Sequence, residues 1–178
     1  PENLIIRQFE ALLEVFDNPL QDGPLATFLA SPLSGQPFSP TELMQLRYLA
    51  EACRDPEEGL YYFHECISTV AEANQDDLGQ KLNLALDRLR KWRLLARQHK
   101  CGDFLRLVLQ DSGYEQVLAR GPYAQRRLTE LQQLKDFVRE TSFDGFDSVQ
   151  KLRQRLQKLR QRDIFPDDTD LQADLPAV

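Results

Sequence analysis

Hydrophobic residues recur every three or four positions along most of the chain, which is the spacing of one face of an α-helix. The first such segment runs from about residue 2 to 16 and the longest from about residue 76 to 99. No segment has the alternating pattern that is typical of a β-strand. The sequence therefore predicts an all-α fold, an irregular bundle of about seven to nine helices. The apolar face of the longest segment comprises Leu78, Leu82, Leu86 or Ala85, Leu89, Trp92, Leu95 and Ala96.

Capping residues and prolines mark the ends of these helices. Ser39, Pro40 and Glu42 match a capping box with proline at the first helical position. Asp22 is expected to cap a short helix that ends before Pro32, because the residue before a proline avoids the helical conformation. Other starts are expected at Asp55-Pro56, at Asp76-Asp77, at Gly121-Pro122 and, for the last helix, at Thr141-Ser142, with Gly113 ending a helix that begins near Asp103.

The helical pattern stops near residue 162. Residues 1–162 are therefore expected to form one domain, and the acidic, proline-containing segment 163–178 a linker or tail. The chain begins at Pro1 without an initiator Met or a signal peptide, so we expect a piece of a longer protein. Its apolar runs are shorter than the roughly 20 residues that span a membrane. A soluble protein is expected.

Three cysteines, Cys53, Cys66 and Cys101, are odd in number and widely spaced. This spacing matches neither a disulfide framework nor a zinc site, and it indicates a reducing, intracellular compartment.

The charge of the chain is unevenly distributed. A net charge of -6 argues against a generally basic nucleic-acid-binding protein. However, residues 88–100 and 151–162 each carry six Lys or Arg residues and no acidic residue. Such runs either form solvated helix faces or bind phosphates without reading sequence. The basic residues are Arg88, Arg90, Lys91, Arg93, Arg97 and Lys100 in the first run, and Lys151, Arg153, Arg155, Lys158, Arg160 and Arg162 in the second.

Motifs for catalysis are missing from the sequence. None of the eight glycines begins a P-loop, so no ATP site is expected in this fragment. His64-Glu65 resembles the start of a zinc-protease helix, but Ser68 stands where the second histidine is needed. We therefore expect no catalytic, metal-binding or cofactor-binding residue here. Trp92 lies on an apolar stripe and is expected in the core rather than in base stacking, whereas the roles of Tyr61, Tyr62 and Tyr114 stay open.

Four blocks of sequence carry a family resemblance. They are "DNPLQDGPLATFLASPL" (17–33), "KWRLLARQHKCGDFLRLVLQDSGY" (91–114), "GPYAQRR" (121–127) and "TSFDGF" (141–146). Together they resemble the accessory 2B subdomain of UvrD-like DNA helicases, most closely that of the AddA/RexA subunit of bacterial helicase-nucleases. The chain departs from the family at Tyr123-Ala124, where relatives usually have Gly-Gly, and at Thr129-Glu130, where they have Asn-Leu.

The resemblance implies a helical insertion within a motor domain of an ATP-dependent 3′–5′ DNA helicase and exonuclease of recombination and repair. ATP and Mg²⁺ would bind the parent protein outside these residues. The subdomain would contact duplex phosphates, the motor domains of its own chain and a partner nuclease subunit, in the bacterial cytoplasm. Three sets of side chains are candidates for nucleic-acid contact: Gln125, Arg126 and Arg127; Arg153, Lys158 and Arg160; and Arg88, Lys91 and Arg97.

Two alternatives stay open from the sequence. Arg126 either helps to bind phosphate at a helix start or pairs with Glu130 one turn later. The chain as a whole is either this helicase subdomain or a stand-alone helical adaptor for an acidic protein partner. An independent hydrolase or nuclease is a remote third possibility.

Overall fold

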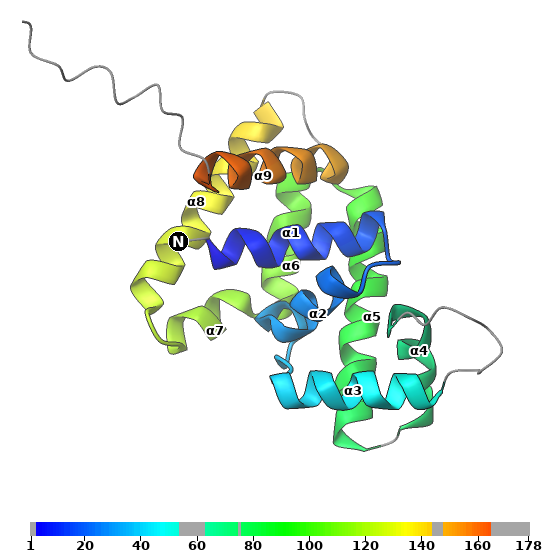
Figure 1. Ribbon diagram of the computed structural model, residues 1–178. Helices are drawn as coiled ribbons and strands as arrows, with labels where there is room; N and C mark the ends of the chain where they lie inside the picture. The colour runs from blue at the N-terminus through cyan, green and yellow to red at the C-terminus, as the bar shows by residue number, and fades with distance from the viewer. Residues whose placement is uncertain (1–2, 54–62, 75, 144–147, 165–178) are drawn as a thin grey trace, which may run out of the picture.

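A computed structural model describes residues 3–53, 63–74, 76–143 and 148–164 (Figure 1). Within these ranges the chain forms nine α-helices and one 3₁₀ turn, and no β-strand, so the predicted all-α bundle is confirmed. The elements are α1 (Leu4–Asp17), α2 (Asp22–Ala30), η1 (Pro32–Ser34), α3 (Pro40–Ala52), α4 (Phe63–Ala73), α5 (Asp77–Gln98), α6 (Cys101–Ser112), α7 (Tyr114–Arg120), α8 (Ala124–Phe143) and α9 (Val149–Ile164).

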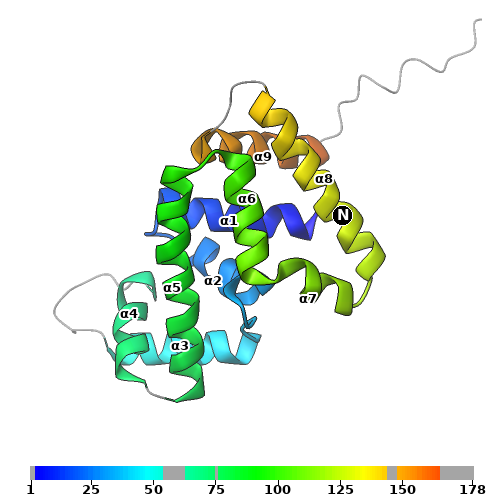
Figure 2. The ribbon, with the colours of Figure 1, turned by 180° about the vertical axis from the view of Figure 1, so that it is seen from behind.

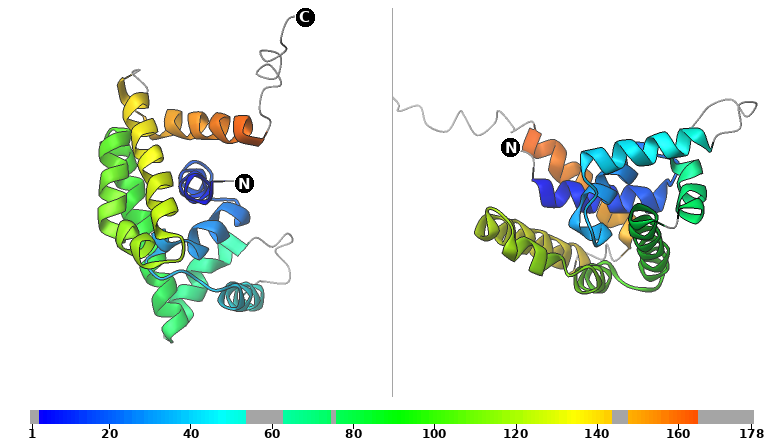
Figure 3. Two further views of the ribbon diagram at one scale, coloured as in Figure 1. Left: turned by 90° about the vertical axis from the view of Figure 1, so that its left-hand side faces the viewer. Right: turned by 90° about the horizontal axis from the view of Figure 1, so that it is seen from below.

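Helix α1 lies at the centre of one half of the molecule and packs against α2, α8 and α9 (Figure 1). Seen from behind, α5 and α6 lie side by side, and α7 leads away from them to α8 (Figure 2). Helices α3 and α4 pack together at the far end of α5. The first and last described helices therefore pack together, and α9 lies next to α1 in both views of Figure 3.

Aromatic side chains fill the core between these helices. Trp92 of α5 is fully buried with its ring edge-on to Phe28, at a centroid distance of 6.3 Å, so its expected place in the core is confirmed. Its indole Nε1 donates a hydrogen bond of 2.7 Å to Asp111, which satisfies the one polar atom of the ring. Tyr114, whose role the sequence left open, is also buried and donates its hydroxyl to Gln8 of α1. Burial raises the pKa of the Tyr114 hydroxyl, which therefore stays a donor.

Three of the predicted helix boundaries are formed as expected. Ser39 and Glu42 make the reciprocal hydrogen bonds of a capping box at the start of α3. The Asp76 carboxylate accepts from the Gly79 amide at the start of α5. Gly113 adopts a left-handed conformation (φ 63°) after α6, where a residue with a Cβ atom is strained.

The predicted start of the last helix is wrong. Helix α8 continues through Thr141 to Phe143, and the buried Thr141 hydroxyl donates to the carbonyl of Phe137 one turn earlier. A threonine within a helix can bond back in this way, so its presence does not by itself mark a start. Helix α9 begins at Val149, and the Ser148 hydroxyl accepts from the Lys151 amide at 3.3 Å.

The predicted role of Asp22 is also wrong. It is the first residue of α2, and the N-cap position before it is held by Gln21, which makes no side-chain capping hydrogen bond. The Asp22 carboxylate instead accepts from the amides of Phe63 (3.2 Å) and His64 (3.1 Å), the first two residues of α4. Although burial alone would raise the pKa of Asp22, these bonds and the His64 side chain lower it. Asp22 therefore caps a helix about forty residues further along the chain.

Helix α8 begins at Ala124, two residues after Pro122. The predicted start at Asp55-Pro56, the side chains of Tyr61 and Tyr62, and segment 165–178 lie outside the described residues. Among the helices that the structure describes, none combines the length and apolar character that crossing a membrane requires.

Candidate nucleic-acid interface

The two basic runs of the sequence meet at a groove where three helices come together. The last turn of α1, the last turns of α5 and the first turn of α9 border it, and these three ends lie together at the right of Figure 1. Its volume is about 430 Å³. We call it the arginine groove, because its basic lining residues are Arg93 and Arg97 of α5 and Arg153 of α9, and its acidic lining residue is Asp17 of α1.

Two of the arginines bind the end of α1. Arg93 donates from Nη2 to the carbonyl of Val15 at 3.0 Å, and Arg153 Nη2 lies 2.9 Å from the Asp17 carboxylate. A helix ends in unpaired carbonyl groups and a partial negative charge, which favour cations. Helix α1 has no basic residue in its own last turn. Arginines from two other helices therefore supply the charge that this end lacks.

The groove also holds one exposed cation, Arg97, and two buried donors that a ligand in the groove does not reach. The Nε atoms of Arg93 and Arg153 are buried and have no hydrogen-bond partner among the described residues. Arg97 lies one turn beyond Arg93, exposed in the last turn of α5. The first turn of α9, with its partial positive charge, borders the same space. Three guanidinium groups against one carboxylate make a site that suits an anion such as phosphate.

The candidates predicted from the sequence include Arg97 and Arg153 but not Arg93. The available signal was the spacing of four residues from Arg93 to Arg97, which places both side chains on one side of a helix. Lys158 lies on the exposed side of α9, and the side chain of Arg160 is outside the described residues.

Arg88 and Lys91, the other candidates of the first run, are engaged within the protein. Arg88 donates to the carbonyl of Leu33 at 3.3 Å and packs against Gly35, where a Cβ atom would come within 2.7 Å of its Nη1. Lys91 pairs with Asp111, the residue that also accepts from Trp92. Although burial alone would raise the pKa of Asp111, the hydrogen bonds from Lys91 and Trp92 lower it. Both basic side chains therefore stabilise the fold around Trp92.

A third set of candidates lies at the turn from α7 into α8. Gln125 and Arg126 are exposed in the first turn of α8, and Arg126 Nε bonds to Glu130 Oε1 at 3.0 Å. Arg127 lies 3.9 Å from the other oxygen of Glu130. The pairing with Glu130 that the sequence left as an alternative is thus formed. We call residues 123–127 the α8 corner.

Tyr123 at this corner has an unusual backbone conformation. It has φ 59°, a left-handed value that is rare for residues other than glycine, and its side chain is 77% exposed. Glycine, which the family resemblance implies at this position, adopts this conformation without strain. The sequence departure noted at Tyr123 therefore has a structural cost.

The described residues contain no group of three or more His, Cys, Asp or Glu side chains that would hold a metal ion. The arginine groove itself is lined by basic, apolar and amide side chains, with Ser148 and Asp17. Such a lining can bind and position an anion. It offers no histidine or cysteine for proton transfer or nucleophilic attack.

Sequence comparison identifies relatives of the chain. By name, each of them is the A subunit of an ATP-dependent helicase/nuclease. The protein from Thermoanaerobacter sp. (strain X514) is 34% identical over 143 residues, which are 79% of this chain and 11% of that protein. The protein from Acetivibrio thermocellus is 31% identical over 138 residues, 76% of this chain and 10% of its own length. The protein from Pelotomaculum thermopropionicum is 30% identical over 151 residues, 85% of this chain and 11% of its own length.

The chain thus spans about a tenth of the length of the relatives that it matches. No protein-family model matches it. The resemblance to the AddA/RexA subunit of bacterial helicase-nucleases, predicted from four blocks of sequence, is confirmed. The assignment to the 2B subdomain stays a prediction.

Proposed function

We propose that this chain, which is related over most of its length to a segment of the AddA/RexA subunit of ATP-dependent helicase-nucleases, is a non-catalytic helical subdomain that contacts the backbone of duplex DNA. The observation that carries the proposal is the meeting of Arg93, Arg97 and Arg153 in one groove. Guanidinium groups bind phosphate through two parallel hydrogen bonds, and such contacts do not read the base sequence. Binding is therefore expected to be independent of DNA sequence.

The parent protein would supply the chemistry. ATP and Mg²⁺ would bind its motor domains, and this subdomain would pack on those domains and on a partner nuclease subunit. The start of α1 and the end of α9 lie near each other in the views of Figures 1 and 3. This supports an insertion, because an inserted domain leaves and rejoins its host at neighbouring points. Phe165 and the residues after it are outside the described residues.

A salt titration tests the proposal. The full 178-residue chain is mixed with a fluorescent 20-base-pair duplex at 20 to 200 mM KCl, and affinity is measured by anisotropy. Phosphate contact predicts that log affinity falls linearly with log salt, with a slope of about -0.9 per phosphate neutralised. A second duplex of unrelated sequence should bind equally well.

Absence of duplex binding at 20 mM KCl would contradict the proposal. It would favour the stand-alone adaptor, provided that an acidic protein ligand binds under the same conditions. Binding that prefers one duplex sequence strongly would also contradict it, because phosphate contacts are the same on every duplex.

A further inference from the structure

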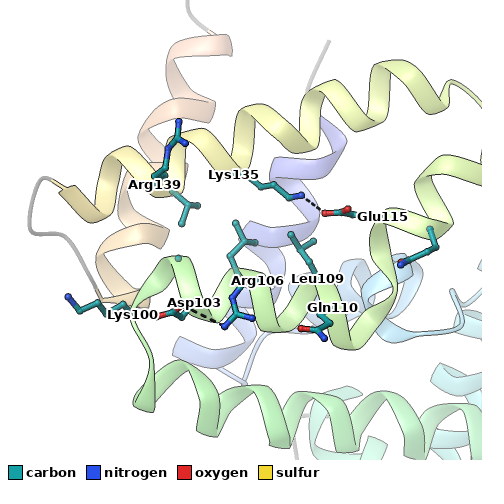
Figure 4. A pocket seen from close by; sticks show the side chains of 12 residues that line it. Lys100, Asp103, Arg106, Leu109, Gln110, Glu115, Lys135 and Arg139 are labelled. Carbon is teal, nitrogen blue, oxygen red and sulfur yellow. Dashed lines mark hydrogen bonds and ion pairs between the residues drawn. The ribbon is translucent and has the colours of Figure 1, made fainter.

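A second groove lies on another face of the molecule, between α6, α7 and α8 (Figure 4). Its volume is about 710 Å³, larger than that of the arginine groove. Leu105 and Leu109 of α6 and Val138 of α8, which are 5%, 6% and 1% exposed, lie at its floor, and the aliphatic stems of longer side chains extend the apolar lining. We call it the leucine groove. None of the nine candidate residues predicted from the sequence lines it.

Basic side chains predominate on the rim of the leucine groove. Lys100 and Arg106 lie on the α6 side and Lys135 and Arg139 on the α8 side (Figure 4). The two acidic lining residues lie beside two of these cations, Asp103 near Arg106 and Glu115 bonded to Lys135. The lining side chains therefore carry an excess of two positive charges around an apolar floor, or of one when Asp136, the partner of Arg139, is counted.

The contacts that hold the outer arginines are weak. Arg106 lies 3.8 Å from Asp103, and Arg139 lies 3.3 Å from Asp136, each one helical turn earlier. Exposed pairs of this kind contribute little to stability. Both guanidinium groups can therefore exchange these partners for carboxylates of a ligand.

We infer that the leucine groove binds an acidic amphipathic helix of a protein partner. Apolar side chains at positions i, i+4 and i+7 of that helix would contact the floor, and its carboxylates would pair with Arg106 and Arg139. Duplex DNA fits this groove less well, because a phosphate backbone has no apolar side to cover the leucines. A volume of about 710 Å³ accommodates a few anchoring side chains, whereas the body of the helix would rest on the rim.

The probe is an 18-residue synthetic peptide with leucines at helical spacing and glutamates elsewhere. Methyl NMR spectra of the full chain are recorded as the peptide is added. The inference predicts shifts at the methyl groups of Leu105, Leu109 and Val138. A peptide with lysine in place of every glutamate should bind at least tenfold more weakly.

Charge reversal at the rim locates the binding. The double variant R106E/R139E is expected to weaken acidic-peptide binding at least tenfold. The single variants R106E and R139E are each compared with R90E, which makes the same change in charge. Arg90 also pairs with an aspartate one turn earlier, at 2.7 Å, and is similarly exposed, at 63% against 65% for Arg106 and 70% for Arg139. Arg90 is not among the residues that line the leucine groove, so R90E should change binding less than twofold.

Three results would overturn the inference: absence of peptide binding at 200 µM, equal binding of the lysine peptide, or equal effects of R106E, R139E and R90E. Displacement of the peptide by duplex DNA would also overturn it and assign the groove to nucleic acid. Circular dichroism checks that each variant is folded. R106E and R90E should change duplex affinity by the same factor. The test of peptide binding at the leucine groove is therefore separate from the test of duplex binding at the arginine groove.

Discussion

The arginine groove and the α8 corner both place arginines beside a helix start, but the two regions differ in where the neutralising carboxylate lies. In the groove, Arg93, Arg97 and Arg153 come from two helices and face a single carboxylate, Asp17. At the corner, Arg126 and Arg127 are neighbours on one helix and share Glu130, one turn later.

The difference follows from where the countercharge lies. A carboxylate one turn away on the same helix reaches its arginines without any tertiary contact, so one of the two arginine charges at the corner is offset locally. The groove concentrates charge because tertiary packing brings separate helices together. Basic residues that converge from distant segments are thus better candidates for ligand contact than basic residues adjacent in sequence.

Removing charge from both regions should give the largest difference. R97Q/R153Q is expected to weaken duplex binding at least tenfold at 50 mM KCl and to reduce the salt slope by nearly two, since each lost contact contributes about 0.9. R126Q/R127Q should weaken it less than threefold, because both arginines lie beside Glu130, which offsets one of their two charges. Anisotropy titrations measure both, and equal losses would end the distinction between the two regions.

Loss of one arginine from each region should also lower the free energy of unfolding by different amounts. Arg93→Met keeps the aliphatic stem but removes the hydrogen bond to Val15, and is expected to lower the free energy of unfolding by about 1 kcal/mol. Arg126→Met removes an exposed pair within one helix and should cost about 0.3 kcal/mol. Urea unfolding followed by circular dichroism gives both values. A larger loss for Arg126→Met would reverse this order.

Relieving the strained turn at the α8 corner should increase stability, whereas the two arginine variants above reduce it. Tyr123→Gly should raise the free energy of unfolding by about 0.5–1 kcal/mol, because glycine adopts φ 59° without strain and the exposed ring has little packing to lose. Ala124→Gly, in the first turn of α8, is the control and should lower stability by about 0.5–1 kcal/mol. Thermal unfolding compares them. Destabilisation by Tyr123→Gly would show that the ring contributes more than its exposure indicates.

Asp111→Asn tests Lys91, the basic residue that the Asp111 carboxylate pairs with inside the protein. The asparagine oxygen can still accept from Trp92, but the charge that holds Lys91 is lost, so duplex affinity should rise by at most twofold. The pKa of Asp111 is lowered on folding, so its contribution to stability is full above pH 3.8 and lost as pH falls below that value. The variant should therefore be less stable than the native chain at pH 7, by about 0.5 kcal/mol. The free energies of unfolding of the variant and the native chain should become equal in acid. A difference that grows as pH falls would contradict this prediction.

Much of the fold was predictable because its signals are local. The capping box at Ser39 and the glycine at Gly113 act within one helical turn, and the stripe that contains Trp92 identifies one face of α5. Thr141 shows the limit of such signals. The same hydroxyl can cap a helix start or bond back within a helix, and only packing decides between them.

The candidate sites were harder to predict because they depend on tertiary contacts. The sequence placed Arg97 and Arg153 in two separate sets, and their meeting depends on how α5 and α9 pack around α1. Asp22 similarly caps a helix that begins at Phe63. The leucine groove had no sequence signal at all, since leucines at helical spacing look the same whether they face a core or a groove.

The hydrogen bond from Tyr114 to Gln8 joins residues 106 positions apart, and α9 packs on the same first helix. A ribosome adds about 5–20 residues per second, so α1 waits roughly 5–20 s before Tyr114 is even synthesised. During that time α1 can pack against α2, but the surface that it later buries against α8 and α9 has no partner. Slowing translation between α1 and α7 should therefore lower the yield of native chain more than slowing it after α9.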